Sequence, residues 1–277
     1  MTAATNLKDI GNTLVLVGAG KMGSTMLQGW LGLGLDPKQV AVIEPQPADD
    51  VKAMAGRGIQ LNPPLNKIGH AGAIILAVKP QVAADAVPPL AVLVGPATVV
   101  VSIMAGKTLA FLESALPNAA AVRAMPNTPA AIGRGITVAV TNARVTPAQR
   151  DLAHRLLAAT GVVEWIKDES LMDAVTAVSG SGPAYVFLLA ESLTQAGIAA
   201  GLPPELAAKL ARETVAGSGE LLHRSPLDPA TLRQNVTSPG GTTAAALEVL
   251  MAAASGLDPL LAKAVAAAMK RSRELAG

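Results

Sequence analysis

The chain has 277 residues, more than one domain usually contains, so two domains are expected. Its 22 Lys and Arg against 20 Asp and Glu leave a net charge of +2, and no basic run is interleaved with aromatic residues, so no nucleic-acid partner is expected. The chain has no cysteine, which excludes disulfides, thiolate catalysis and cysteine-ligated metals, and we expect no metal site. Although 51% of the residues are apolar, Gly, Pro or Ser interrupts the longest apolar stretches, so we expect a cytoplasmic protein that does not bind membranes.

Short apolar segments alternate with helical patterns through the first half of the chain. Continuous apolar strands separated by helices predict a mostly parallel sheet with helices on both faces. The expected strands are residues 13–17, 40–43, 73–78, 98–103, 120–125, 136–140 and 162–166. The expected helices that lie between most of these strands are residues 49–55, 82–90, 109–115 and 147–159.

A glycine-rich motif, Gly18-Ala19-Gly20-Lys21-Met22-Gly23, lies between the first strand and a helical pattern. In this context Gly18 allows a tight turn, Gly20 lets a pyrophosphate approach the backbone, and Gly23 lets the helix pack closely on the strand. The second strand ends at Glu44, about 20 residues after the motif, where an acid that binds the adenine ribose is expected. Together these features predict a Rossmann-type site for a nicotinamide dinucleotide, NADP or NAD. A plain glycine turn or an FAD site is the alternative.

Ligands on parallel sheets bind beyond the carboxyl ends of the strands. Three further segments are expected at that edge, namely residues 77–81, 103–106 and 125–129. The last is stiffened by two prolines, and its Asn127 and Thr128 can bond to backbone or ligand. A plain crossover loop is the alternative for this segment.

After residue 166 the strand pattern ends, which predicts a dinucleotide-binding domain over 1–166 and an all-helical domain over 167–277. Expected helices span residues 184–200, 203–223, 243–254 and 258–275, and the run 179–182 before the first is a second candidate for ligand contact. The helices at 184–200 and 243–254 have almost no charge on any face. Such helices must be surrounded, so a second subunit is expected to cover part of this domain.

A second glycine-containing turn, residues 236–241, leads directly into the helix that starts near Thr243. The free amides of a helix N-terminus and the helix dipole favour an anion there, and the hydroxyls of Ser238, Thr242 and Thr243 are additional donors. An ordinary capped helix is the alternative interpretation of this turn.

The chain resembles pyrroline-5-carboxylate reductase, the enzyme of the last step of proline biosynthesis, from about Leu14 to Leu275. Many dehydrogenases share the first motif that carries the resemblance, whereas the last three, in this order, are specific. The motifs are Gly18-Ala19-Gly20-Lys21-Met22-Gly23, Ala77-Val78-Lys79-Pro80-Gln81, Arg123-Ala124-Met125-Pro126-Asn127-Thr128-Pro129, Ser179-Gly180-Ser181-Gly182-Pro183-Ala184-Tyr185 and Val236-Thr237-Ser238-Pro239-Gly240-Gly241-Thr242-Thr243.

The resemblance implies reduction of 1-pyrroline-5-carboxylate to L-proline by hydride transfer from NAD(P)H to a cyclic imine. It also implies a helical dimerisation domain, a homodimer and possibly a ring of dimers. The implied catalytic residue is Thr243, with its hydroxyl near the ring nitrogen, and the implied substrate-binding residues are Ser238, Gly240, Gly241, Thr242 and Thr243. The expected cofactor-binding residues are Gly18, Gly20, Lys21, Met22, Gly23, Glu44, Ala77, Val78, Lys79, Pro80, Met125, Pro126 and Asn127.

Other side chains are expected to have structural roles. The three histidines, His70, His154 and His223, lack a partner motif, and Glu191 is expected to be a buried acid satisfied by hydrogen bonds. Two other functions are alternatives. A 3-hydroxyacid dehydrogenase shares this domain order but needs a lysine on the long helix, and residues 184–200 contain none. A dinucleotide sensor without catalysis would not need the hydroxyl-lined anion site.

Overall fold

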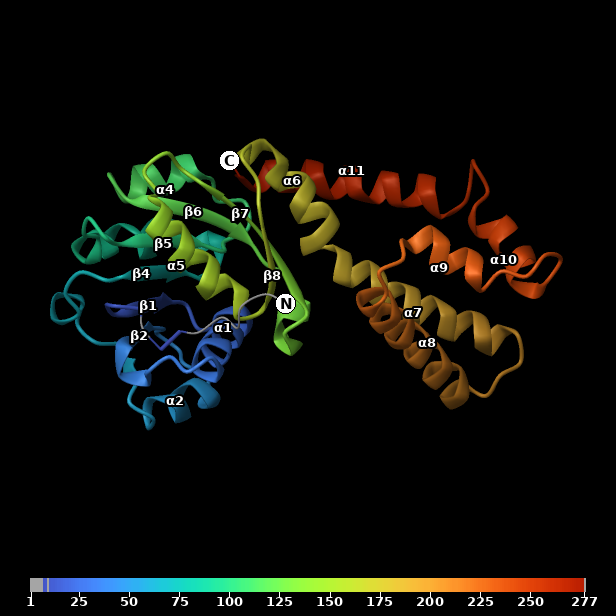
Figure 1. Cartoon of the computed structure of the whole chain (residues 1–277), viewed down its shortest axis with the longest axis horizontal. Helices are drawn as coiled ribbons and strands as arrows, with labels where there is room; N and C mark the ends of the chain where they lie inside the picture. The colour runs from blue at the N-terminus through green and yellow to red at the C-terminus, as the bar shows by residue number, and fades with distance from the viewer. Residues whose placement is uncertain (1–6, 9, 277) are drawn as a thin grey trace. The chain divides into compact units, whose positions relative to one another are not determined.

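The computed structural model describes residues 7–8 and 10–276 (Figure 1). Contacts along the backbone divide the chain into two compact units. The first runs to Gly180 and includes the chain from Met269 onward, and the second is Ser181–Ala268. This division falls later in the chain than residue 166, and the expected boundary of the functional domains stays a prediction. No helix among the described residues is long and apolar enough to cross a membrane.

The first unit contains the expected sheet. Its strand order is β3-β2-β1-β4-β5-β6-β7-β8, and every neighbouring pair is parallel except β6 and β7. The strands are β1 (Leu14–Val17), β2 (Val40–Ile43), β3 (Gln60–Leu61), β4 (Ala73–Leu76), β5 (Val99–Ser102), β6 (Ala120–Met125), β7 (Gly135–Thr141) and β8 (Gly161–Trp165). The prediction missed only β3, which is too short to show a pattern of apolar residues.

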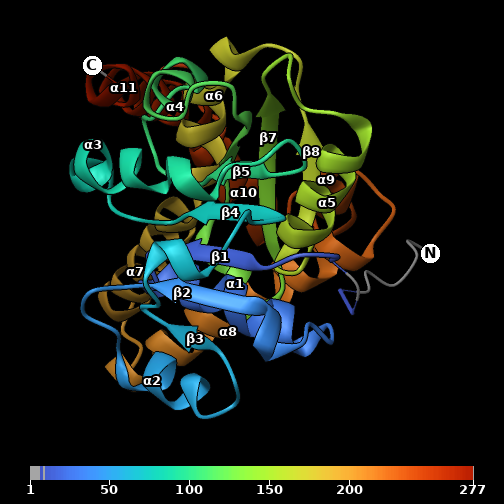
Figure 2. The ribbon, with the colours of Figure 1, turned by 90° about the vertical axis from the view of Figure 1, so that its left-hand side faces the viewer.

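Helices cover both faces of the sheet, as predicted. All four residues of β1 are buried because successive side chains point to opposite faces and both faces are covered. One face packs against α1 (Lys21–Gly32), α2 (Asp49–Ala55) and α5 (Pro147–Ala158). The other packs against α3 (Ala83–Ala86), α4 (Leu109–Ala115) and α6 (Met172–Val175), and Figure 2 shows α3 and α4 on one side of the strands and α5 on the other.

The helix expected over residues 82–90 is broken. Only α3 is α-helical there, and 3-10 turns flank it at Pro80–Val82 and Pro88–Leu93. Pro88 and Pro89 explain the break, because proline lacks the N–H that would continue the helix and disfavours helical backbone in the preceding residue.

The second unit is helical, and its helices lie close to their predicted bounds. They are α7 (Gly182–Ala199), α8 (Pro204–Arg224), α9 (Pro229–Asn235), α10 (Thr242–Leu250) and most of α11 (Leu257–Ala276). The sequence prediction missed α9, although Asp228 before Pro229 is a clear start signal. The Asp228 carboxylate accepts hydrogen bonds from the hydroxyl and the backbone N–H of Thr231, and both bonds lower the pKa of Asp228.

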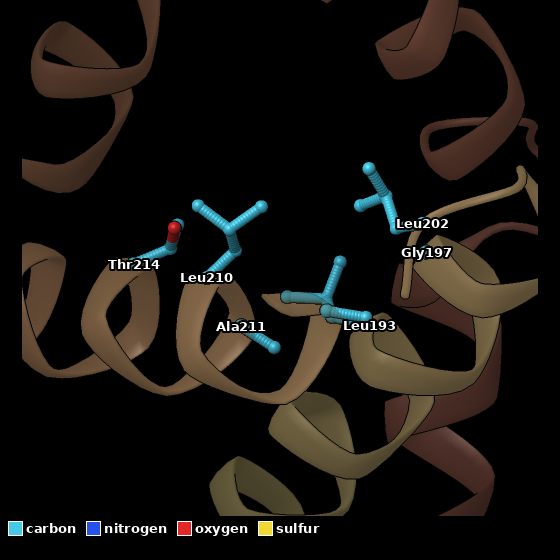
Figure 3. A pocket seen from close by; sticks show the side chains of 7 residues that line it. Leu193, Gly197, Leu202, Leu210, Ala211 and Thr214 are labelled. Carbon is cyan, nitrogen blue, oxygen red and sulfur yellow. The ribbon is translucent and has the colours of Figure 1, made fainter. Parts of the chain in front are cut away.

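A shallow groove lies between α7 and α8 where the two helices come together. Leucine side chains from both helices and from the turn that joins them line it, as Figure 3 shows for Leu193, Leu202 and Leu210. Gly197 permits the close approach of the two helices, because a Cβ there would lie 3.2 Å from the Cβ of Ala207. The unit therefore leaves apolar side chains at its surface, in keeping with a partner that covers them.

Candidate cofactor and substrate sites

The carboxyl ends of four parallel strands lie level with one another. The register pairs Val17 of β1 with Ile43 of β2 and Leu76 of β4, and Leu76 pairs in turn with Ser102 of β5. The residues that follow these strands, which include the glycine motif, Glu44 and Ala77, therefore share one edge of the sheet. The strand order reverses between β1 and β4, and this crevice is where doubly wound sheets bind ligands.

Two glycines of the motif are required by the fold itself. Gly18 has φ +91°, and a Cβ there would lie 2.7 Å from the backbone of Ala77. A Cβ at Gly23 would lie only 2.2 Å from the carbonyl oxygen of Gly18. These glycines let β1, β4 and α1 approach one another, in the roles predicted for them.

Gly20 differs, because the fold does not require glycine there. Its φ is −68°, and no atom of the described residues beyond its chain neighbours lies within 4 Å of the place that a Cβ would occupy. Gly20 is exposed and forms the N-cap of α1, which has no capping side chain and no acidic residue in its first turn. The open space and the free helix start fit the pyrophosphate of a dinucleotide, which needs close approach to the backbone and donors from the helix.

Glu44 is held beside the glycine motif. Its Oε2 accepts a hydrogen bond of 2.9 Å from the backbone N–H of Ala19, and its Oε1 accepts one of 3.0 Å from the N–H of Gln46. A carboxylate has about four acceptor positions, so each oxygen retains one for a ligand hydroxyl. The structure thus brings the predicted ribose acceptor and the predicted phosphate turn together.

The segment after β6 contacts a turn that also belongs to the first unit. Asn127 Oδ1 accepts from the N–H of Ile136 at 3.0 Å, and its Nδ2 donates to Ser179 Oγ at 3.4 Å. Ser179 lies in a π-helical turn, Thr176–Gly180, and π turns often occur at functional sites. A Cβ at Gly180 would lie 2.5 Å from Met125 Cε, the flexible end of that side chain, so Gly180 and Met125 are in close proximity. Two motifs far apart in sequence therefore meet here.

Arg123 of β6 forms a nearly buried ion pair that the sequence did not reveal. Its Nη1 lies 2.8 Å from Glu169 Oε1, and only 7% of the Arg123 side chain is exposed. The same oxygen accepts from the N–H of Leu109 at the start of α4, at 2.8 Å. A buried charge needs compensation, and Glu169 supplies it while it links β6 to the start of α4.

In the second unit, residues 238–241 form the expected tight turn before α10. Gly240 has φ +67°, and the N–H of Gly241 donates to the Ser238 carbonyl at 3.0 Å. The N-cap of α10 is Gly241, no side chain of the described residues caps the helix, and its first turn contains no acid. The free amides of this helix start are available to an anion.

The hydroxyls of the second unit differ in their hydrogen bonding. Thr194 and Thr237 each donate to the carbonyl four residues earlier, at 2.9 and 2.6 Å. Within the described part of the chain, the hydroxyls of Ser238 and Thr243 make no such bond. They are therefore free to bond to a ligand, unlike an ordinary helical threonine.

Two family models cover most of the chain. The model of pyrroline-5-carboxylate reductase dimerisation matches residues 169–275, and one described as "NADP oxidoreductase coenzyme F420-dependent" matches residues 13–106. Pyrroline-5-carboxylate reductase of Pseudomonas aeruginosa is 38% identical over 265 residues, covering 95% of this chain and 96% of the relative. The chain belongs to the pyrroline-5-carboxylate reductases.

Solved structures agree with this assignment. A pyrroline-5-carboxylate reductase from Coxiella burnetii superposes with a TM-score of 0.88 at 32% identity, covering 96% of this chain and 99% of that one. The reductase of Plasmodium falciparum, solved with NADP bound, gives a TM-score of 0.81 at 28% identity, with 96% and 99% coverage. Membership in the pyrroline-5-carboxylate reductase family decides against both alternatives, a 3-hydroxyacid dehydrogenase and a non-catalytic sensor.

The structure tests the roles expected for His154 and Glu191. His154 has the expected structural role, because its Nδ1 accepts a hydrogen bond of 3.2 Å from Trp165 Nε1. The expectation that Glu191 is buried is wrong for the single chain, where Glu191 is exposed. The reason is that α7 buries none of its residues within one chain, and its Phe187 is 66% exposed. This is the surface that a reductase dimer would cover.

Proposed function

We propose that the chain reduces 1-pyrroline-5-carboxylate to L-proline with a nicotinamide dinucleotide as the hydride donor, and that the 238–243 turn binds the substrate. The observation that carries the proposal is the uncapped start of α10, where the hydroxyls of Ser238 and Thr243 have no hydrogen bond to any described residue, in a chain of this family. A spectrophotometric assay with pyrroline-5-carboxylate tests it directly. Oxidation of NADH or NADPH that depends on the imine is expected, and its absence in a folded protein with bound cofactor would refute the proposal.

The glycine motif and its neighbours would hold the cofactor, which supplies the hydride when bound. The N–H groups at the start of α1 bind the pyrophosphate, and Glu44 accepts from the adenine ribose. The segments at 77–80 and 125–127 line the same sheet edge and are proposed to flank the nicotinamide half. The proposed contacts in these segments are Ala77, Val78, Lys79, Pro80, Met125, Pro126 and Asn127.

The turn before α10 would bind the substrate carboxylate. Ser238 and the amides of 240–243 are donors, and the helix dipole favours the negative charge. The pyrroline nitrogen can arrive already protonated, so the reaction needs a hydrogen-bonding group beside it rather than a strong base. Thr243 is the proposed group, because its hydroxyl has no hydrogen bond to the described residues that it must break first.

Glu44 predicts the cofactor preference. We expect NADH to be used better than the frequent NADPH preference of this family suggests, because a carboxylate repels a 2′-phosphate but accepts well from ribose hydroxyls. Steady-state kinetics with both cofactors measure this. A catalytic efficiency at least tenfold higher with NADPH would contradict the assignment of Glu44.

The apolar surface of the second unit predicts an obligate dimer, possibly assembled further into a ring of dimers. Neither α7 nor α10 buries a residue within one chain, and Val249 of α10 is 72% exposed. We expect light scattering to show no stable folded monomer at working concentrations, because this much apolar surface favours association. A monodisperse, fully active species with the mass of one chain would disprove the prediction.

A cytoplasmic location likewise stays a prediction.

A further inference from the structure

The side chain of Asn62 forms two hydrogen bonds with the backbone of Glu44. It follows β3 directly, and its side-chain Oδ1 accepts from the N–H of Glu44 at 2.8 Å while its Nδ2 donates to the Glu44 carbonyl at 2.9 Å. If the amide were flipped, its NH2 group would face the Glu44 N–H and its oxygen would face the Glu44 carbonyl oxygen. The two bonds together therefore define the orientation of the amide. The side chain thereby continues the pairing of β2 and β3 by one residue after β3 has ended.

The backbone of Asn62 adopts a conformation that few residues tolerate. Its φ is +49°, in the left-handed region where asparagine is the best-suited residue after glycine. The N–H of Asn62 also donates to the Val42 carbonyl at 2.7 Å, so the backbone is tied to β2 as well. Among the other non-glycine residues that the structure describes, only Asn118 has a positive φ, of +71°.

The two hydrogen bonds from Asn62 to the Glu44 backbone restrict the positions that the Glu44 carboxylate can adopt. Pro45 follows, and its ring restricts the chain on that side. Both carboxylate oxygens already accept a backbone N–H, one from Ala19 and one from Gln46. Turning the carboxylate away from a ligand would break both of these bonds, and the Asn62 bonds prevent the backbone from rotating to compensate.

We propose that Asn62 is a positioning residue that sets the choice between NADH and NADPH. It holds the Glu44 carboxylate where ribose hydroxyls can donate to it, and it keeps the carboxylate from moving aside for a 2′-phosphate. The inference rests on the proposed function, since it requires a nicotinamide dinucleotide at the glycine motif.

The test is the affinity of the full-length protein for NADH and for NADPH, measured by calorimetry without substrate. Asn62→Gly keeps the positive φ available and removes both side-chain bonds. We expect the NADH dissociation constant to rise about fivefold or more, as for the loss of a hydrogen bond, with that for NADPH unchanged or lower. The matched control is Asn118→Gly, the same change at the other left-handed asparagine, which precedes β6 at its amino end and should alter neither affinity.

A double-mutant cycle separates positioning from a merely structural role. In a Glu44→Ala background, Asn62→Gly should have no further effect on the preference, because the group it positions is gone. An equal change in both backgrounds would overturn the proposal, as would an unchanged preference in the single variant. If circular dichroism shows that Asn62→Gly is unfolded, Asn62→Asp replaces it, since it retains the acceptor for the Glu44 N–H but loses the donor to its carbonyl.

The outcomes also separate this inference from the proposed function. A parent protein that binds neither NADH nor NADPH would refute the function itself. A parent that binds and reduces the imine while Asn62→Gly keeps its cofactor preference would refute only the role of Asn62.

Discussion

Thr243→Val should lower kcat/KM for pyrroline-5-carboxylate by about 10- to 150-fold while the affinity for NADH stays nearly unchanged. Valine keeps the shape and the β-branching of threonine but removes the hydroxyl. A hydrogen bond to a charged group contributes about 1.5 to 3 kcal/mol, which corresponds to this range if the bond strengthens in the transition state. Steady-state kinetics and a cofactor titration measure the two effects separately.

The matched control for this prediction is Thr194→Val. The Thr194 hydroxyl donates to the carbonyl of Ala190 in its own helix, so its loss should leave kcat/KM close to that of the parent. If Thr243→Val were as active as the parent, or lost NADH affinity to the same degree as activity, then Thr243 would serve only the start of α10 and the proposed role would be wrong.

Gly20→Ala should weaken NADH binding by about 5- to 150-fold without lowering the melting temperature. The added methyl group meets no protein atom within 4 Å, and the φ of −68° suits alanine, so the fold has no reason to resist the change. The methyl group would instead occupy space that the pyrophosphate needs, and overpacking of this kind costs about 1 to 3 kcal/mol. Calorimetry measures the affinity, and thermal unfolding measures the stability.

Gly32→Ala, at the other end of α1, is the control for Gly20→Ala. A Cβ at Gly32 also meets no atom of the described residues within 4 Å, so neither stability nor affinity should fall. Equal NADH affinity in Gly20→Ala and the parent would show that the dinucleotide does not approach the backbone at this turn. By contrast, Gly23→Ala would combine both effects, because its Cβ would lie 2.2 Å from the Gly18 carbonyl oxygen.

The sequence by itself determined the fold class, most of its elements and the family. Buried strands and apolar helices show regular patterns of apolar residues along the sequence. Glycines such as Gly18 occur where the local backbone requires a positive φ. Both features can therefore be predicted from nearby residues. The same reasoning failed where local signals were weak or conflicting. The two residues of β3 carry no periodicity, and the prolines after α3 break a helix that the apolar pattern suggests.

Only the tertiary structure decided which polar groups are bonded and which are free. The Glu44 carboxylate accepts from Ala19 and Gln46. The Glu44 N–H donates to Asn62, whose amide donates back to the Glu44 carbonyl. The partner of Arg123 is Glu169, 46 residues away. Among the described residues, the lack of a hydrogen bond at the Thr243 hydroxyl and the open space beside Gly20 are likewise properties of the folded chain. The physical reason is that hydrogen bonds and open space depend on the positions of atoms from distant segments, which no local pattern encodes.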